Sequence, residues 1–279
     1  MPLHRALPVI LSLLLSGCAS GPPGVSHPGA GFVLYTREPP SESEAVSREA
    51  REFLEDLAGY LKLQVPPGSL LRIYHYPHRW GLWWHLNREV PSLRWRRGVC
   101  YETDEAYIVT LCGQPGTEKF RQTLRHELTH YLVAAHFCDI PPWIDEGLSQ
   151  VMSSGPPFPH LEGDLLDTAQ REARRRRETG CLRLLHVPAG KKLTTSQYHL
   201  ARALTCYLLT HPSGAAPTDL LRFLETSVAG VPPEKAFSAS WGISMEDACQ
   251  AMVTWSGATD AKGERRKGKG ERQAGPASP

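Results

Sequence analysis

Two histidines four residues apart, with a glutamate beside the first, are the residues of this sequence best suited to metal chemistry. They stand in the segment HELTH, as His126, Glu127 and His130. Side chains at positions i and i+4 of a helix lie on one face, so both imidazoles can bind a single metal ion. The carboxylate of Glu127 can then reach a metal-bound water without being a ligand itself.

A further carboxylate, Glu146, follows in the segment PPWIDEGLSQ, residues 141–150. Pro141 stops the preceding helix and Pro142 suits the first turn of a new one, so we expect Glu146 on a second helix. Two histidines and one glutamate leave one position of a tetrahedral zinc ion open. An open position is typical of catalytic zinc, because structural zinc sites fill all four. The spacing therefore predicts a catalytic zinc site formed by His126, His130 and Glu146.

The residues around the HELTH segment predict the helix that carries it. Thr117 suits the N-cap, and apolar residues recur at helical spacing up to about residue 136. A segment of the type HExxH also arises by chance on solvated helices, so a coincidental or lapsed site is the alternative.

The two segments together resemble the gluzincin peptidases, in which HExxH is joined by a glutamate from a downstream helix. The closer similarity is to the bacterial peptidase-MA-like group, which carries P-x-W-x-x-E-G-L after HExxH. The resemblance is strongest over residues 117–153. It implies that His126, His130 and Glu146 bind Zn²⁺ and that Glu127 is the general base.

This resemblance implies a peptidase mechanism. Zinc lowers the pKa of its bound water to about 7 and polarises the substrate carbonyl, while Glu127 takes the proton and delivers it to the leaving amine. By analogy with gluzincin-like proteins, Tyr198 or His199 would stabilise the oxyanion, although a half-buried helix aromatic is the alternative for Tyr198. By the same analogy, we expect Tyr107–Thr110 to bind the substrate backbone by strand addition.

The N-terminal residues 1–17 have the pattern of a bacterial lipoprotein signal peptide. A positively charged start precedes an apolar run too short to span a bilayer. The tetrapeptide Leu15-Ser16-Gly17-Cys18 resembles a lipobox, which implies cleavage before Cys18, its acylation and membrane anchoring. Ala19 would by analogy favour the outer membrane, with the protein facing the periplasm. An ordinary secretory signal with a nearby cysteine is the alternative.

Cysteine usage supports export from the cytoplasm. Assigning Cys18 to lipid leaves six of seven cysteines, an even number compatible with disulfides. Cys100 and Cys112 flank a hairpin expected from strands at 99–103 and 106–111, and we expect them to be bonded. Four others could form two more disulfides in an undetermined order, or remain buried thiols: Cys138, Cys181, Cys206 and Cys249.

The pattern along the chain predicts an α+β fold. A small mixed sheet with helices is expected first, with strands at 32–36 and 70–76, a helix at 43–63 and a tryptophan-rich helix or loop at 79–87. A mostly helical, zincin-like lobe carrying the metal site follows, with helices near 163–179, 196–210, 218–226, 233–241 and 244–255. The expected divisions are a signal peptide at 1–17, a flexible tether at 18–30, an α+β lobe at 31–116, the helical zinc-site lobe at 117–256 and a disordered basic tail at 257–279.

The favoured function is a membrane-anchored zinc metallopeptidase acting on peptide or protein substrates. The formal net charge of +2 is too small to favour nucleic acid as a partner. One alternative is a zinc-binding lipoprotein without turnover, against which the intact Glu127 argues. The other is a zinc amidase acting on cell-wall peptides, which would use the same residues. Neither cleavage specificity nor oligomeric state is predicted.

Overall fold

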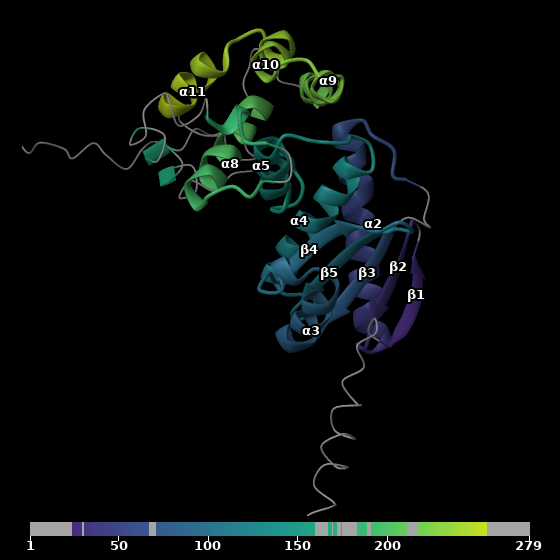
Figure 1. Ribbon diagram of the computed structural model, residues 1–279. Coiled ribbons are helices and arrows are strands. Elements are labelled where there is room, and N and C mark those ends of the chain that lie inside the picture. The colour runs from purple at the N-terminus through teal and green to yellow at the C-terminus, as the bar shows by residue number, and fades with distance from the viewer. Residues whose placement is uncertain are drawn as a thin grey trace, which may run out of the picture. The chain divides into compact units, whose positions relative to one another are not determined.

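The structure is a computed structural model that describes residues 24–29, 31–66, 71–159, 167–168, 170–171, 174, 183–188, 191–210 and 217–255. The chain forms two compact units, residues 1–138 and 139–279. The first unit combines a sheet with helices and the second is helical, which confirms the predicted α+β class (Figure 1). The expected signal peptide, Cys18 and the basic tail lie outside the described residues, as does most of the helix expected at 163–179.

The sheet of the first unit is mixed and has five strands in the order β1-β2-β3-β5-β4. Strands β2, β3 and β5 run parallel, and the edge strands β1 and β4 are antiparallel to their neighbours. The strands are β1 Val25–Gly29, β2 Phe32–Thr36, β3 Leu71–Tyr76, β4 Gly98–Glu102 and β5 Tyr107–Cys112. The strands predicted at 32–36 and 70–76 and the predicted hairpin are thus confirmed.

Strand β1 corrects part of the predicted tether. Val25–Gly29 pairs antiparallel with β2 along its whole length. Without β1, the backbone groups on that side of β2 would have no partner in the sheet. Gly31 has a φ of 91°, a conformation that glycine adopts readily in the turn between the two strands. The segment expected to be a flexible linker therefore contains an edge strand.

Helices cover both faces of this sheet. α2 (Pro40–Leu61) and α4 (Glu118–Ala134) lie on one face, and α3 (Arg79–Glu89) on the other (Figure 1). The side chain of Arg125 on α4 joins Glu49 on α2 through a 2.7 Å ion pair. Thr117 caps α4, because its hydroxyl oxygen accepts the backbone N–H of Phe120 at 3.3 Å, as the sequence predicts. A short 3-10 helix, η2 (Pro91–Leu93), follows α3.

Five helices are described in full in the second unit, close to their predicted positions. They are α5 Pro142–Met152, α8 Thr195–Thr210, α9 Pro217–Val228, α10 Pro233–Trp241 and α11 Met245–Thr254. Their core contains an aromatic group in which Trp143 of α5 lies 5.6 Å from Phe223 and 6.3 Å from Phe237, measured between ring centroids. No helix among the described residues combines the length and apolar character needed to cross a membrane.

The division between the units falls after Cys138, whereas the sequence predicted a boundary after Gly116. The reason is the packing of α4. Its Tyr131 ring lies 5.5 Å from the Tyr107 ring of β5, and Phe120 lies 5.1 Å from His75 of β3. These contacts make α4 part of the sheet-containing unit rather than of the helical one.

The predicted disulfide between Cys100 and Cys112 is wrong, since both residues remain thiols. The register of the hairpin explains this result. Cys100 lies opposite Val109, and Cys112 follows Leu111, the partner of Gly98. Because side chains alternate along a strand, the two cysteines point to opposite faces of the sheet. Among the other described cysteines, Cys138, Cys206 and Cys249 are also thiols, and Cys181 lies outside the described residues.

Candidate metal centre

The two histidines predicted as ligands lie one turn apart on α4. Their Nε2 atoms are 3.1 Å apart, and their ring centroids are 4.7 Å apart. Both side chains are half-buried. The arrangement follows from the helical spacing of i and i+4, which directs both rings from the same side of α4.

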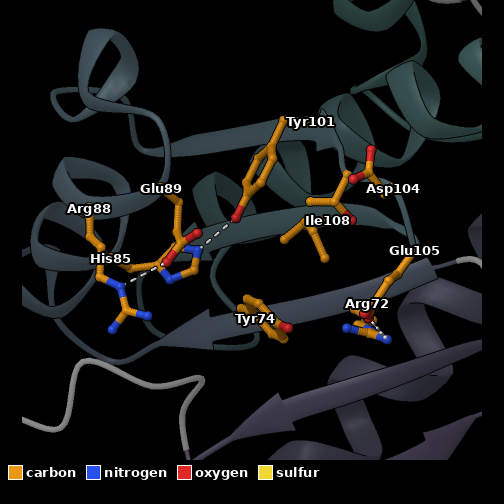
Figure 2. A pocket seen from close by; sticks show the side chains of 10 residues that line it. Arg72, Tyr74, His85, Arg88, Glu89, Tyr101, Asp104, Glu105 and Ile108 are labelled. Carbon is orange, nitrogen blue, oxygen red and sulfur yellow. Dashed lines mark hydrogen bonds and ion pairs between the residues drawn. The ribbon is translucent and has the colours of Figure 1, made fainter.

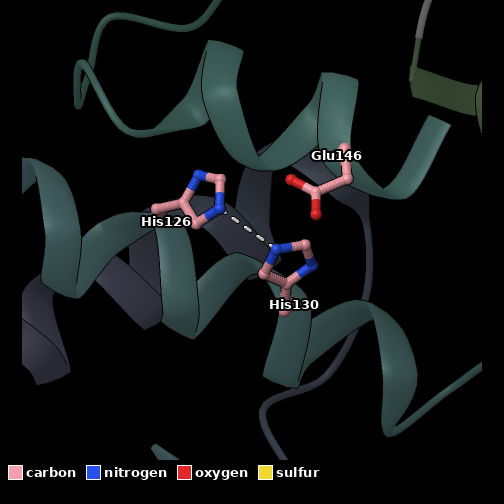
Figure 3. A group of neighbouring side chains, drawn as sticks. All are labelled: His126, His130 and Glu146. Atoms are coloured by element: carbon pink, nitrogen blue, oxygen red, sulfur yellow. Dashed lines mark hydrogen bonds between the residues drawn. The ribbon is translucent and has the colours of Figure 1, made fainter. Parts of the chain in front are cut away.

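The carboxylate of Glu146, on α5, completes a group of three. One ligand atom from each of His126, His130 and Glu146 lies within 4.8 Å of the other two, so the group could hold a metal ion. Figure 3 shows the carboxylate turned toward the two imidazoles. The structure thus brings together all three residues that the sequence analysis proposed as ligands.

The separation of the two imidazole nitrogens fits a small divalent cation. Two nitrogens bound tetrahedrally at the usual zinc–nitrogen distance would lie about 3.3 Å apart, close to the observed separation of the Nε2 atoms. Two imidazoles and one carboxylate are also a donor set typical of catalytic zinc. The three donors therefore form a candidate metal site.

Tyr198 contacts the metal-site carboxylate. Its hydroxyl donates a 3.0 Å hydrogen bond to Oε1 of Glu146, from α8 to α5. This contact would orient a ligand, as partners of metal-binding residues commonly do. The role that the sequence predicts for Tyr198, stabilisation of an oxyanion, is a different one and stays a prediction.

Gly147 explains how α8 comes so close to Glu146. A Cβ atom built on Gly147 would collide with Oγ1 of Thr205 and would lie 2.7 Å from the backbone oxygen of Ala201. Both neighbours belong to α8, so only glycine permits this approach of the two helices. The glycine after the ligand therefore has a packing role that brings Tyr198 within reach of the carboxylate.

Trp143 fixes the other side of α5. Its side chain is fully buried, at 0% exposure, among the aromatic rings of the helical core. It precedes Glu146 by three positions and so lies nearly one turn before it. The tryptophan anchors the helix while the glutamate remains half-buried at its surface.

Glu127 lies against the edge strand β4. Its side chain is only 7% exposed. A Cβ atom on Gly98 would lie 2.8 Å from Oε1 of Glu127 and 2.7 Å from Cγ2 of Thr123, so the close approach requires glycine at this position. Gly98 was not among the residues predicted for the site, although a glycine within a strand pattern is a known signal of close backbone approach.

The position of β4 also corrects the predicted substrate strand. Tyr107–Thr110 belongs to β5, which pairs with β3 on one side and β4 on the other. Both of its edges are used by the sheet, so it cannot accept another strand. The edge strand next to β5 is β4, and its Gly98 approaches Glu127.

A separate cavity of about 570 Å³ lies on the α3 face of the sheet (Figure 2). Nε2 of His85 lies 2.9 Å from the hydroxyl of Tyr101, and burial lowers the pKa of His85. Arg72 pairs with Glu105 at 3.0 Å. None of the residues lining this cavity belongs to the His126, His130 and Glu146 group.

Comparison with protein-family models and with curated proteins finds no match to this chain.

Proposed function

We propose that this protein is a zinc metallopeptidase. The observation that carries the proposal is the combination of a two-histidine, one-glutamate group with a second, buried carboxylate that follows the first histidine. Three protein ligands leave a position for water or substrate. A binding protein with a purely structural metal would have no use for Glu127 beside an open position, so the burial of this carboxylate favours an enzyme.

In the proposed hydrolysis, three residues would bind the metal ion and Glu127 would transfer the proton. A zinc ion held by His126, His130 and Glu146 would lower the pKa of water and polarise the substrate carbonyl. Glu127 accepts a proton from the attacking water and delivers it to the nitrogen of the departing amine. Its burial against Gly98 restricts the carboxylate to few positions, which supports directed proton transfer.

The edge strand β4 supplies a place for an extended substrate. One row of its backbone groups pairs with β5, and the other row lies outside the sheet's own hydrogen bonding. A peptide added along that row would run past Gly98 and so past Glu127. We therefore assign substrate backbone binding to Gly98–Glu102 in place of Tyr107–Thr110.

The proposed location is the bacterial cell envelope, through an acyl anchor on Cys18. The support is the LSGC tetrapeptide after a short apolar run. Mass spectrometry of the protein extracted from membranes should find the chain beginning at an acylated Cys18. A mature chain that begins elsewhere and carries no lipid would contradict the proposed acyl anchor. It would leave the peptidase proposal unaffected.

The peptidase proposal is tested with Glu127→Gln, which keeps the shape of the side chain and removes the base. Turnover of a peptide library should fall by about 1000-fold or more, while the zinc content stays that of the wild type. Glu118→Gln is the matched control, since it makes the same change at an exposed position of α4. Wild-type rates in Glu127→Gln would refute the assigned mechanism.

A further inference from the structure

Four tryptophans of the first unit form one aromatic cluster at the protein surface, here called the tryptophan face: Trp80, Trp83, Trp84 and Trp95. The rings of Trp80 and Trp83 are stacked, with centroids 5.0 Å apart. Trp84 and Trp95 lie 5.1 and 6.1 Å from Trp83. Trp80, Trp84 and Trp95 are 63%, 46% and 66% exposed. Among the described residues, Val228 is the one other large hydrophobic side chain with comparable exposure.

The packing of α3 does not account for these exposed rings. The helix contacts the sheet through Leu82 and Leu86, both 0% exposed, which pack with Tyr74 and Tyr76 of β3. Trp80 and Trp84 extend from the remaining surface of the helix. A contiguous exposed apolar patch on a soluble domain is costly in water and commonly marks a binding surface.

The charge around the tryptophan face is strongly positive. Residues 79–97 contain five arginines, against the single acid Glu89, which pairs with Arg88 at 3.1 Å. The guanidinium of Arg94 lies 5.7 Å from the ring of Trp95. Arg79 donates a 3.0 Å hydrogen bond to the backbone oxygen of Trp95, which ties the loop to α3. Arg79 and Arg94 thus lie beside Trp95, and Arg96 and Arg97 follow it directly in the sequence.

We propose that the tryptophan face binds an anionic membrane surface. Indole rings prefer the boundary between lipid head groups and acyl chains, because they are apolar with a polar N–H. Arginines attract anionic head groups and can bury their stems beside the rings while the guanidinium stays in the polar layer. Exposed tryptophans in an arginine-rich segment match this boundary in both polarity and charge.

The tryptophan face lies near the end of the sheet at which β1 begins. Val25 lies opposite Thr36 at the C-terminal end of β2, and β2 runs parallel to β3. Strand β3 ends at Tyr76, just before α3 begins. Strand β1 therefore begins at the same end of the sheet, the C-terminal end of β2 and β3, from which the chain continues into α3.

The proposed lipid anchor would hold this end of the sheet, and with it the tryptophan face, near the bilayer. Six residues lead from Cys18 to Gly24, a length that can span at most about 20 Å. The orientation of the first unit toward the bilayer rests on the proposed anchor. Binding by the tryptophan face needs neither the anchor nor catalysis.

The test is flotation of the unlipidated full chain, Cys18→Ser, with vesicles of phosphatidylglycerol and phosphatidylethanolamine. Adding Trp80→Ser and Trp95→Ser to this parent should lower the partition coefficient of the protein between vesicles and buffer about tenfold. Arg96→Gln/Arg97→Gln, which leaves every ring in place, should also lower it and should weaken its salt dependence. Val228→Ser, another exposed apolar position, is the matched control and should bind as the parent does.

The outcomes separate this proposal from the peptidase function. Glu127→Gln should bind vesicles like the parent protein even if turnover is lost. Because residues 1–17 are the same in all variants, parent-level binding by both the tryptophan and the arginine variants would overturn the proposal. Equal binding to vesicles of phosphatidylcholine alone would overturn the role of charge. Variants that lose binding to isolated peptidoglycan, but not to anionic vesicles, would assign the surface to a cell-wall glycan instead.

Discussion

At the residue scale, the hydrogen bond from the Tyr198 hydroxyl to Oε1 of Glu146 determines how this carboxylate is held. A hydroxyl that donates to one carboxylate oxygen leaves the other oxygen for a metal and fixes the plane of the carboxylate. The same hydroxyl would have to change partner to stabilise an oxyanion. The two roles predict different consequences when the hydroxyl is removed.

Tyr198→Phe should weaken zinc binding about tenfold or more, because an unrestrained ligand loses its orientation. Competition with a chromogenic chelator would measure the zinc dissociation constant. Tyr207→Phe makes the same change further along α8 and should leave the constant unchanged. A Tyr198→Phe variant with normal zinc affinity but a much lower kcat would identify an oxyanion role instead.

Gly98→Ala should displace the carboxylate of Glu127, because the added methyl group would lie 2.8 Å from its Oε1. A shift of about 1 Å in a catalytic group can lower a rate about 100-fold, and steady-state kinetics with a peptide substrate would measure it. Zinc content should not change. Gly59→Ala, where a Cβ meets nothing within 4 Å, is the control. Unchanged kcat in Gly98→Ala would remove β4 from the site.

At the scale of helices and strands, the contact between α5 and α8 determines whether the Tyr198 hydroxyl reaches Glu146. The two helices approach closely at Gly147, where a side chain would collide with Thr205 and the backbone of Ala201. The buried Trp143 holds the same helix in the aromatic core. The segment W-x-x-E-G-L thus places the anchor Trp143, the candidate ligand Glu146 and the close contact at Gly147 within little more than one turn of α5.

Gly147→Ala should therefore lower the free energy of unfolding by about 1–3 kcal/mol, since the helices must separate. Urea unfolding followed by circular dichroism would measure the change. The zinc affinity should fall with it, because Tyr198 moves away from Glu146. A variant as stable as the wild type would show that the helices are less tightly packed than the contact implies.

Sequence reasoning succeeded at this scale where the determinants are local. The cap of Thr117, the proline pair at 141–142 and the i, i+4 spacing each act within one or two turns. They correctly indicated the metal-site helices and the convergence of His126, His130 and Glu146.

Pairing between strands is not local, and the two predictions that depended on it were wrong: the Cys100–Cys112 disulfide and the substrate strand Tyr107–Thr110. Nothing near Cys100 or Cys112 encodes a register that turns them to opposite faces. The central position of β5 depends on its pairing with β3, more than thirty residues earlier in the chain. The approach of Gly98 to Glu127 likewise depends on how α4 packs against the sheet.

At the scale of the whole molecule, we expect buried histidines to make the free energy of unfolding depend on pH. Nε2 of His75 donates to the backbone oxygen of Gly113 at 2.8 Å, and Nδ1 lies 3.0 Å from the hydroxyl of Thr36. Burial lowers the pKa of His75, and it also lowers that of His85. Below the usual histidine pKa of about 6.5, the unfolded chain binds more protons than the folded one.

The free energy of unfolding should therefore be highest above pH 6.5 and fall as the pH is lowered toward the depressed folded-state values. Urea titrations between pH 7.5 and 5.5, with a chelator present, would measure this loss. His75→Gln should show a smaller acid loss than the wild type, while His186→Gln, at an exposed position, should not. Equal pH dependence in all three proteins would contradict the assignment to His75.

The central claim is that His126, His130 and Glu146 bind one zinc ion together. Metal analysis of the purified full chain by atomic emission, after dialysis against trace zinc, tests it most directly. We predict about one zinc per chain for the wild type and for Glu127→Gln, and a large loss for His126→Ala and Glu146→Ala. A wild-type protein without zinc, or a Glu146→Ala variant that retains it in full, would contradict the account.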